Sequence, residues 1–102
     1  MPATILVVED EEDISILLRY NLEAEGFRVL TAETGDEAQE RIQDKLPDLI
    51  LLDWMLPEVS GIELCRRMRA REETARVPII MITARGEEEE RVRGLATGAD
   101  DY

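Results

Sequence analysis

Short apolar runs alternate along this chain with segments of helical periodicity. Four runs have the length of strands, namely residues 4–8 ("TILVV"), 27–32 ("FRVLTA"), 48–53 ("DLILLD") and 77–83 ("VPIIMIT"). Three of them are apolar nearly throughout, which is typical of strands that are buried on both faces of a parallel sheet. The run at 27–32 is less uniformly apolar, so we predict that it forms an edge strand.

The segments between these runs predict helices. Residues 12–26 place Ile14, Leu17, Leu18 and Leu22 on one helical face and end at Gly26, a residue favoured just past a helix. Alternation of strands and helices predicts an α/β fold with a doubly wound parallel sheet and right-handed crossovers.

Two capping boxes predict where the next two helices begin. Thr34 with Glu37 opens one helix, and Ser60 with Glu63 opens the other. The positions predicted to face the core are Ala38 and Ile42 in the first helix and Ile62, Cys65 and Met68 in the second.

The last part of the chain, "GEEEERVRGLATGADDY", predicts a fourth helix from about residue 86 and the start of a fifth strand at 99–102. The helix begins with acids and continues with arginines, so Glu87–Arg91 and Glu89–Arg93 are i,i+4 pairs of favourable polarity. We therefore interpret the four glutamates as a solvated helix start and not as a ligand cluster.

Composition excludes several classes of chemistry. The 102 residues suit one domain. They include no histidine, which excludes imidazole catalysis. The single cysteine, Cys65, excludes a zinc cluster and a disulfide framework and favours a reducing cytoplasm. The net charge of −12 argues against direct binding of nucleic acid. Neither a membrane-spanning run nor a signal peptide is visible, so no membrane association is expected.

Three acidic residues and a threonine lie where the predicted strands end. Glu9 and Asp10 follow the first run, Asp53 ends the third and Thr83 ends the fourth. If these strands are neighbours, Glu9 or Asp10 would meet Asp53 and Thr83 at the carboxyl edge, where such sheets bind ligands. Each residue has a structural alternative, because Asp10 or Asp13 could cap the following helix and Asp53 could form a turn.

Crowded carboxylates raise one another's pKa unless a cation balances them. A ligand set made only of oxygen atoms favours a hard divalent ion, Mg²⁺ before Ca²⁺. A carboxylate beside Mg²⁺ is also a competent nucleophile toward phosphorus. The predicted chemistry is phosphoryl transfer to an aspartate.

The motifs "ILVVEDEEDI", "PDLILLDWMLPEVSGIEL" and "PIIMITARGEEEERVRGLATGADDY" resemble the receiver domain of two-component response regulators over nearly the entire chain. The resemblance is greatest to the winged-helix transcription-factor class, and within it to regulators of the phosphate regulon. It implies a flavodoxin-like receiver fold with strand order 2-1-3-4-5.

The resemblance also assigns roles by position. Asp53 would be the phosphoacceptor, and Mg²⁺ would be bound by Asp53, by Asp10 directly, by Glu9 through water and by the backbone carbonyl of Met55. Thr83 would bind the phosphoryl group together with the amides of Met55 and Ala84.

The same resemblance implies how the signal is passed on. Tyr102 would be an aromatic switch coupled to Thr83, and Met55 and Arg85 would tune the lifetime of the phosphorylated state. The domain would receive its phosphoryl group from a sensor histidine kinase and control a DNA-binding output domain. It would be a regulatory phosphoacceptor that catalyses only its own phosphorylation and dephosphorylation. Activated copies would form a homodimer through a face that includes Arg91, Val92, Leu95 and Asp101.

One feature of the family is missing from the sequence. Receiver domains carry a lysine shortly after the position of Tyr102, and Lys45 lies too early in the chain to replace it. We therefore expect residues 1–102 to form a receiver domain that is incomplete at its C-terminus, with strand five truncated and helix five absent. We also expect impaired phosphorylation and dimerisation of such a fragment.

The sequence leaves two alternatives to a phosphorylated switch. A dehalogenase-type phosphatase also uses an aspartate after a buried strand, but it needs a second aspartate two residues later, where this chain has Met55. A receiver-fold interaction module without phosphorylation is the other alternative, and an incomplete acidic set would favour it.

Overall fold

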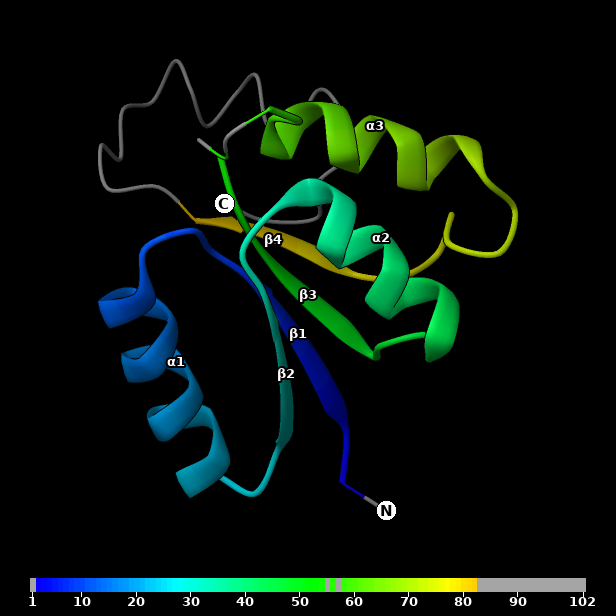
Figure 1. Ribbon diagram of the computed structural model, residues 1–102. Helices are drawn as coiled ribbons and strands as arrows, with labels where there is room; N and C mark the ends of the chain where they lie inside the picture. The colour runs from blue at the N-terminus through cyan, green and yellow to red at the C-terminus, as the bar shows by residue number, and fades with distance from the viewer. Residues whose placement is uncertain (1, 55, 57, 83–102) are drawn as a thin grey trace.

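The computed structural model describes residues 2–54, 56 and 58–82 of the chain (Figure 1). The predicted helix from residue 86 and the predicted strand start at 99–102 lie outside the described residues.

The described residues form a four-stranded sheet in the order β2-β1-β3-β4, and every neighbouring pair is parallel. The doubly wound α/β prediction and the edge position of the second strand are therefore confirmed. The strands are β1 (Thr4–Val8), β2 (Arg28–Ala32), β3 (Leu49–Asp53) and β4 (Ile79–Ile82).

In the described part of the chain, three helices cover the two faces of the sheet. Figure 1 shows α1 (Glu12–Ala24) on one face and both α2 (Gly35–Asp44) and α3 (Gly61–Ala70) on the other. None of the helices that the structure describes is long and apolar enough to cross a membrane.

The central strands bury side chains on both faces, as their uniformly apolar sequence predicts. On the face of α2 and α3, a large cluster joins Leu6, Ile50 and Leu52 to Ala38 and Met68 of the helices. On the opposite face, a smaller cluster is covered by α1. Its members are Ile5, Val7 and Val29, with Leu18, Leu22, Leu49 and Leu51 packed against them.

Both predicted helix caps are present. The Thr34 hydroxyl accepts a hydrogen bond from the Glu37 amide at 3.1 Å, and the Ser60 hydroxyl accepts one from the Glu63 amide at 3.1 Å. In the first box, the Glu37 carboxylate accepts from the amide of Glu33, one residue before the cap, at 3.4 Å. The caps therefore fix where α2 and α3 begin, and with them the end of the loop that follows β3.

The predicted inner face of α1 is only partly correct. Leu18 and Leu22 pack against the smaller cluster, but Leu17 is 59% exposed. Leu17 lies at the border of the apolar stripe, and among the described residues no segment packs over it. The helix is therefore less deeply buried than its periodicity predicts.

Candidate functional site

The register of the sheet brings Glu9 and Asp53 to the same edge. The β1–β3 ladder ends with Val8 opposite Leu52, so the next residues along the two strands are Glu9 and Asp53. The Glu9 amide still donates to the Ala32 carbonyl at 3.0 Å, which fixes the backbone of Glu9 to the edge strand. Both carboxylates are thus held by the ends of hydrogen-bonded strands.

Three carboxylates meet at this position. Glu9, Asp10 and Asp53 each place one carboxylate oxygen within 4.8 Å of the others. Glu9 is only 4% exposed, Asp53 is half-buried and Asp10 lies at the solvent side. The predicted convergence of Asp53 with the acids after the first strand is therefore observed, and both Glu9 and Asp10 take part.

Neither Asp10 nor Asp13 caps α1, although Asp13 lies in the first turn, where its charge complements the helix dipole. The N-cap of α1 is Glu11, and its side chain makes no capping hydrogen bond. The amide of Glu11 instead donates to the Glu9 carboxylate at 3.1 Å. Glu9 is therefore oriented by the turn that leads into α1.

The surroundings of Glu9 disfavour its charged form. Desolvation by burial is the main cause that raises its pKa from 4.5 to about 7. The neighbouring Asp53 adds repulsion and a side-chain hydrogen bond, and Asp10 adds further repulsion, while the hydrogen bond from Glu11 acts in the opposite direction. Near neutral pH, the negative charges of this cluster are therefore not balanced by its surroundings.

A divalent cation would resolve this imbalance. The donor set consists of carboxylate oxygens, which suit a hard ion such as Mg²⁺, and the mixture of buried and exposed positions leaves room for water ligands. Glu9, Asp10 and Asp53 thus fit such an ion.

The raised pKa of Glu9 has a consequence for stability. Between about pH 4.5 and 7 the folded state holds the Glu9 proton more tightly than the unfolded state, so the free energy of unfolding falls as pH rises through this window. In metal-free buffer, Glu9→Gln is therefore expected to stabilise the protein at pH 8 by about 1–2 kcal/mol and to have little effect near pH 4.5.

Urea unfolding at both pH values measures this difference. Glu40→Gln is the matched control, because Glu40 is exposed on α2 and its substitution removes the same charge. A Glu9→Gln variant that is equally or less stable than the wild type at pH 8 would refute the burial argument.

Gly61 is a residue of the site that sequence reasoning missed. A Cβ atom at Gly61 would overlap the carbonyl oxygen of Asp53 and lie 3.0 Å from its carbonyl carbon. The Gly61 amide also donates to the Trp54 carbonyl at 3.1 Å. The first residue of α3 therefore packs directly on the backbone that carries Asp53, and only glycine leaves room for this contact.

Gly61→Ala is expected to lower the free energy of unfolding by about 2–3 kcal/mol, because the backbone of Asp53 or of α3 must shift. Urea unfolding checks the change. Gly26→Ala is the comparison, since the added Cβ at Gly26 meets nothing within 4 Å and only its φ of 94° costs about 1 kcal/mol. Equal losses for the two variants would contradict the close approach at Asp53.

Several predicted functional residues lie outside the described residues. Ile82, opposite Asp53 in the β3–β4 ladder, is the last described residue of that strand, and Thr83 follows it in sequence. The roles assigned by position to these residues remain predictions: Met55, Thr83, Ala84, Arg85, Arg91, Val92, Leu95, Asp101 and Tyr102.

Comparison with known proteins identifies the family. The model of the response regulator receiver domain matches residues 5–102. The chain belongs to this family. The resemblance drawn from its motifs is thus confirmed, and the carboxylates of Glu9, Asp10 and Asp53 lie within the matched residues.

Curated relatives confirm the likeness to phosphate-regulon regulators. The phosphate regulon transcriptional regulatory protein PhoB of Rhizobium meliloti (strain 1021) is 76% identical over 98 residues, which are 96% of this chain and 43% of that protein. PhoB of Escherichia coli (strain K12) is 51% identical over 102 residues, or 100% of this chain and 44% of the relative. The chain thus spans less than half the length of these relatives.

Solved structures confirm the receiver fold. The chemotaxis protein CheY4 of Vibrio cholerae has a TM-score of 0.92 at 30% identity, with 99% of this chain and 84% of that chain covered. The BeF3-activated receiver domain of RstA from Klebsiella pneumoniae has a TM-score of 0.90 at 34% identity, with coverages of 97% and 82%.

Proposed function

We propose that this receiver domain is a phosphorylation-controlled signalling switch and that Asp53 is its phosphoacceptor. The observation that carries the proposal is the meeting of Asp53 with Glu9 and Asp10 within 4.8 Å at the carboxyl edge of the parallel sheet. This edge is where open α/β sheets bind their ligands. Membership of the receiver family supports the same assignment.

Mg²⁺ is the proposed cofactor. Asp10 and Asp53 would hold it directly, Glu9 would hold it through water, and the carbonyl of Met55 would complete the protein ligands. When bound, the ion would neutralise the carboxylates and the charge of a phosphoryl group. The raised pKa of Glu9 to about 7 supports the need for a cation here.

The protein's own part in the reaction is to present a fixed nucleophile. A carboxylate oxygen of Asp53 attacks the phosphorus atom of phosphohistidine on a sensor kinase, and a P–O bond forms. The P–N bond breaks, and its electron pair leaves with the imidazole nitrogen. The close packing of Gly61 on the Asp53 backbone supports the role, because a positioned nucleophile reacts faster than a mobile one.

The consequences of phosphorylation extend the proposal. Thr83 and Ala84 would bind the phosphoryl group. Tyr102 would change its orientation in response, and this change would alter a dimerisation face that includes Arg91, Val92, Leu95 and Asp101. Self-association through that face would control a DNA-binding output domain in the cytoplasm. Relatives named as phosphate regulon regulators support a role in the response to phosphate. The domain would thus be a regulator and not a metabolic enzyme.

Incubation with acetyl phosphate and Mg²⁺ tests the proposal. The transfer breaks the P–O bond of the donor and releases acetate, so the intact protein is expected to gain the mass of one phosphoryl group. Because phosphorylation of residues 1–102 is expected to be impaired, the same incubation is carried out with a longer version of the protein. An unchanged mass of both after prolonged incubation would overturn the proposed function and would favour a receiver-fold interaction module.

A further inference from the structure

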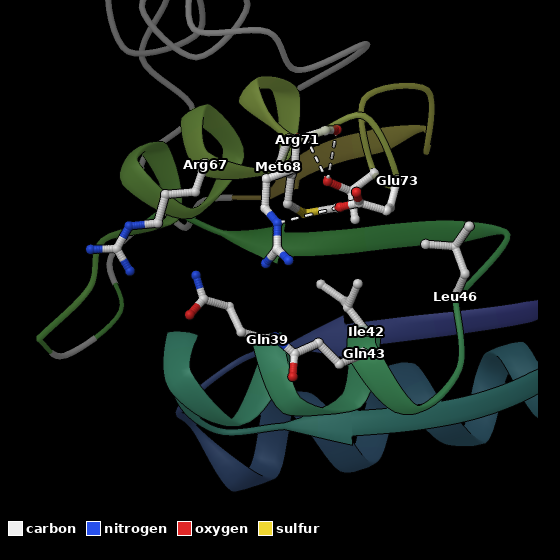
Figure 2. A pocket seen from close by; sticks show the side chains of 9 residues that line it. Gln39, Ile42, Gln43, Leu46, Arg67, Met68, Arg71 and Glu73 are labelled. Atoms are coloured by element: carbon white, nitrogen blue, oxygen red, sulfur yellow. Dashed lines mark hydrogen bonds and ion pairs between the residues drawn. The ribbon is translucent and has the colours of Figure 1, made fainter.

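An open groove separates α2 from α3 on their shared face of the sheet (Figure 2). It encloses about 390 Å³, which is within the range of small-molecule sites. On the α2 side its wall consists of Gln39, Ile42 and Gln43 of the helix and of Leu46, which lies just past the helix end. Ile42 belongs to the core, whereas Leu46 is 50% exposed beside it. The groove thus has an apolar floor that continues to the surface.

The α3 side combines an apolar residue with two cations and one carboxylate, that of Glu73. Met68 is buried, whereas Arg67 of α3 and Arg71, the residue just after the helix, are exposed. In Figure 2, the guanidinium group of Arg71 extends into the space between the helices. The buried hydroxyl of Thr74 donates to the Met68 carbonyl at 2.6 Å and to the Arg71 carbonyl at 3.4 Å. The backbone that carries Met68 and Arg71 is therefore held in place.

The two groove arginines are only loosely paired. Arg71 Nε lies 3.5 Å from a Glu73 carboxylate oxygen, and Arg67 Nε lies 3.7 Å from Glu63. Both distances exceed the 2.7–2.9 Å that charge-assisted hydrogen bonds prefer. By contrast, Arg69 donates to the Val77 carbonyl at 2.7 Å. Within the described part of the chain, the ion pair of Arg71 involves its Nε atom and leaves its terminal nitrogens available for an anion.

The charge around the groove differs from that of the rest of the chain. Residues 61–77 contain five arginines and three glutamates, whereas the whole chain has 12 basic and 24 acidic residues. The lining of the groove itself carries two arginines and one glutamate, so the α3 side attracts a small anion.

We propose that this groove binds a small amphipathic carboxylate. The apolar body of the ligand packs on Ile42, Leu46 and Met68, and its carboxylate binds the terminal nitrogens of Arg71. A planar guanidinium matches a carboxylate with two parallel hydrogen bonds. This site is separate from the carboxylate cluster at Asp53 and goes beyond the proposed phosphorylation.

Sodium octanoate is a suitable probe, and an ¹⁵N–¹H correlation spectrum of the full chain reports where it binds. Saturable shifts are expected at residues 39–46 and 67–74. Arg71→Gln is expected to weaken binding about tenfold or more, because it removes hydrogen bonds to a charged group. Arg28→Gln, an exposed change on β2 outside the groove, is the charge-matched control and is expected to leave the affinity unchanged.

Two further ligands separate the contribution of the apolar chain to the affinity from that of the carboxylate. Octanol lacks the carboxylate and acetate lacks the apolar body, so both are expected to bind more weakly than octanoate. Shifts outside the groove, non-saturable shifts, or equal octanoate affinity of Arg71→Gln and wild type would overturn the proposal. An Asp53→Asn variant is expected to bind octanoate with the affinity of the wild type. The octanoate experiment therefore tests the groove independently of whether Asp53 is phosphorylated.

Discussion

Replacing Asp53 by asparagine is expected to abolish phosphorylation by acetyl phosphate. The substitution keeps the shape of the side chain but removes the anionic oxygen that would attack phosphorus. Glu9 and Asp10 each have a carboxylate oxygen within 4.8 Å of one of Asp53, and both remain in the variant. The experiment therefore also shows whether either of them can replace Asp53 as the acceptor. Intact-protein mass spectrometry measures the result directly.

Asp44→Asn is the matched control for this experiment. Asp44 is an exposed residue at the end of α2, so its substitution removes one charge without touching the carboxylate cluster. It is expected to be labelled like the wild type. Normal labelling of Asp53→Asn would show that the phosphoryl group resides elsewhere and would refute the assignment.

Removal of the cation is the second large perturbation. Labelling in the presence of EDTA is expected to fall to background, because no ion would then offset the charge of the carboxylates and the incoming phosphoryl group. Asp10→Asn is expected to weaken Mg²⁺ binding by about tenfold or more, because a charged ligand is lost at the solvent side of the cluster. Trp54, the single tryptophan of the chain, directly follows Asp53, and its fluorescence serves to monitor a Mg²⁺ titration.

Asp13→Asn controls for the general loss of negative charge near this edge. Asp13 is exposed in the first turn of α1 and is not a member of the cluster. Its substitution is expected to change the Mg²⁺ affinity by less than about threefold, since exposed charges are screened. Equal affinities of Asp10→Asn and wild type would contradict the proposed ligand set.

Much of the fold could be predicted because the sequence signals are local. Uniformly apolar strands imply burial on both faces, and the hydroxyl caps at Thr34 and Ser60 mark where α2 and α3 begin. The convergence of Glu9 and Asp53 was also predictable, because parallel strands bring their carboxyl ends to one edge.

Other features depend on tertiary geometry that the sequence does not display. The need for glycine at position 61 arises from its approach to the Asp53 carbonyl, and glycine at the start of a helix has no distinctive pattern. The exposure of Leu17 reflects what packs beside α1, which periodicity does not reveal. The groove that places Arg71 beside apolar side chains likewise depends on the spacing of α2 and α3, which the sequence does not display.

Mapping the phosphorylated residue is the most direct test of whether Asp53 is the phosphoacceptor. Borohydride reduces an aspartyl phosphate to homoserine and leaves a free aspartate unchanged, so peptide mass spectrometry after labelling locates the acceptor. Homoserine is expected at position 53 and at no other aspartate in samples that contained Mg²⁺ and acetyl phosphate. Reduction at Asp10, or at an aspartate remote from the cluster with Asp53 intact, would contradict this assignment.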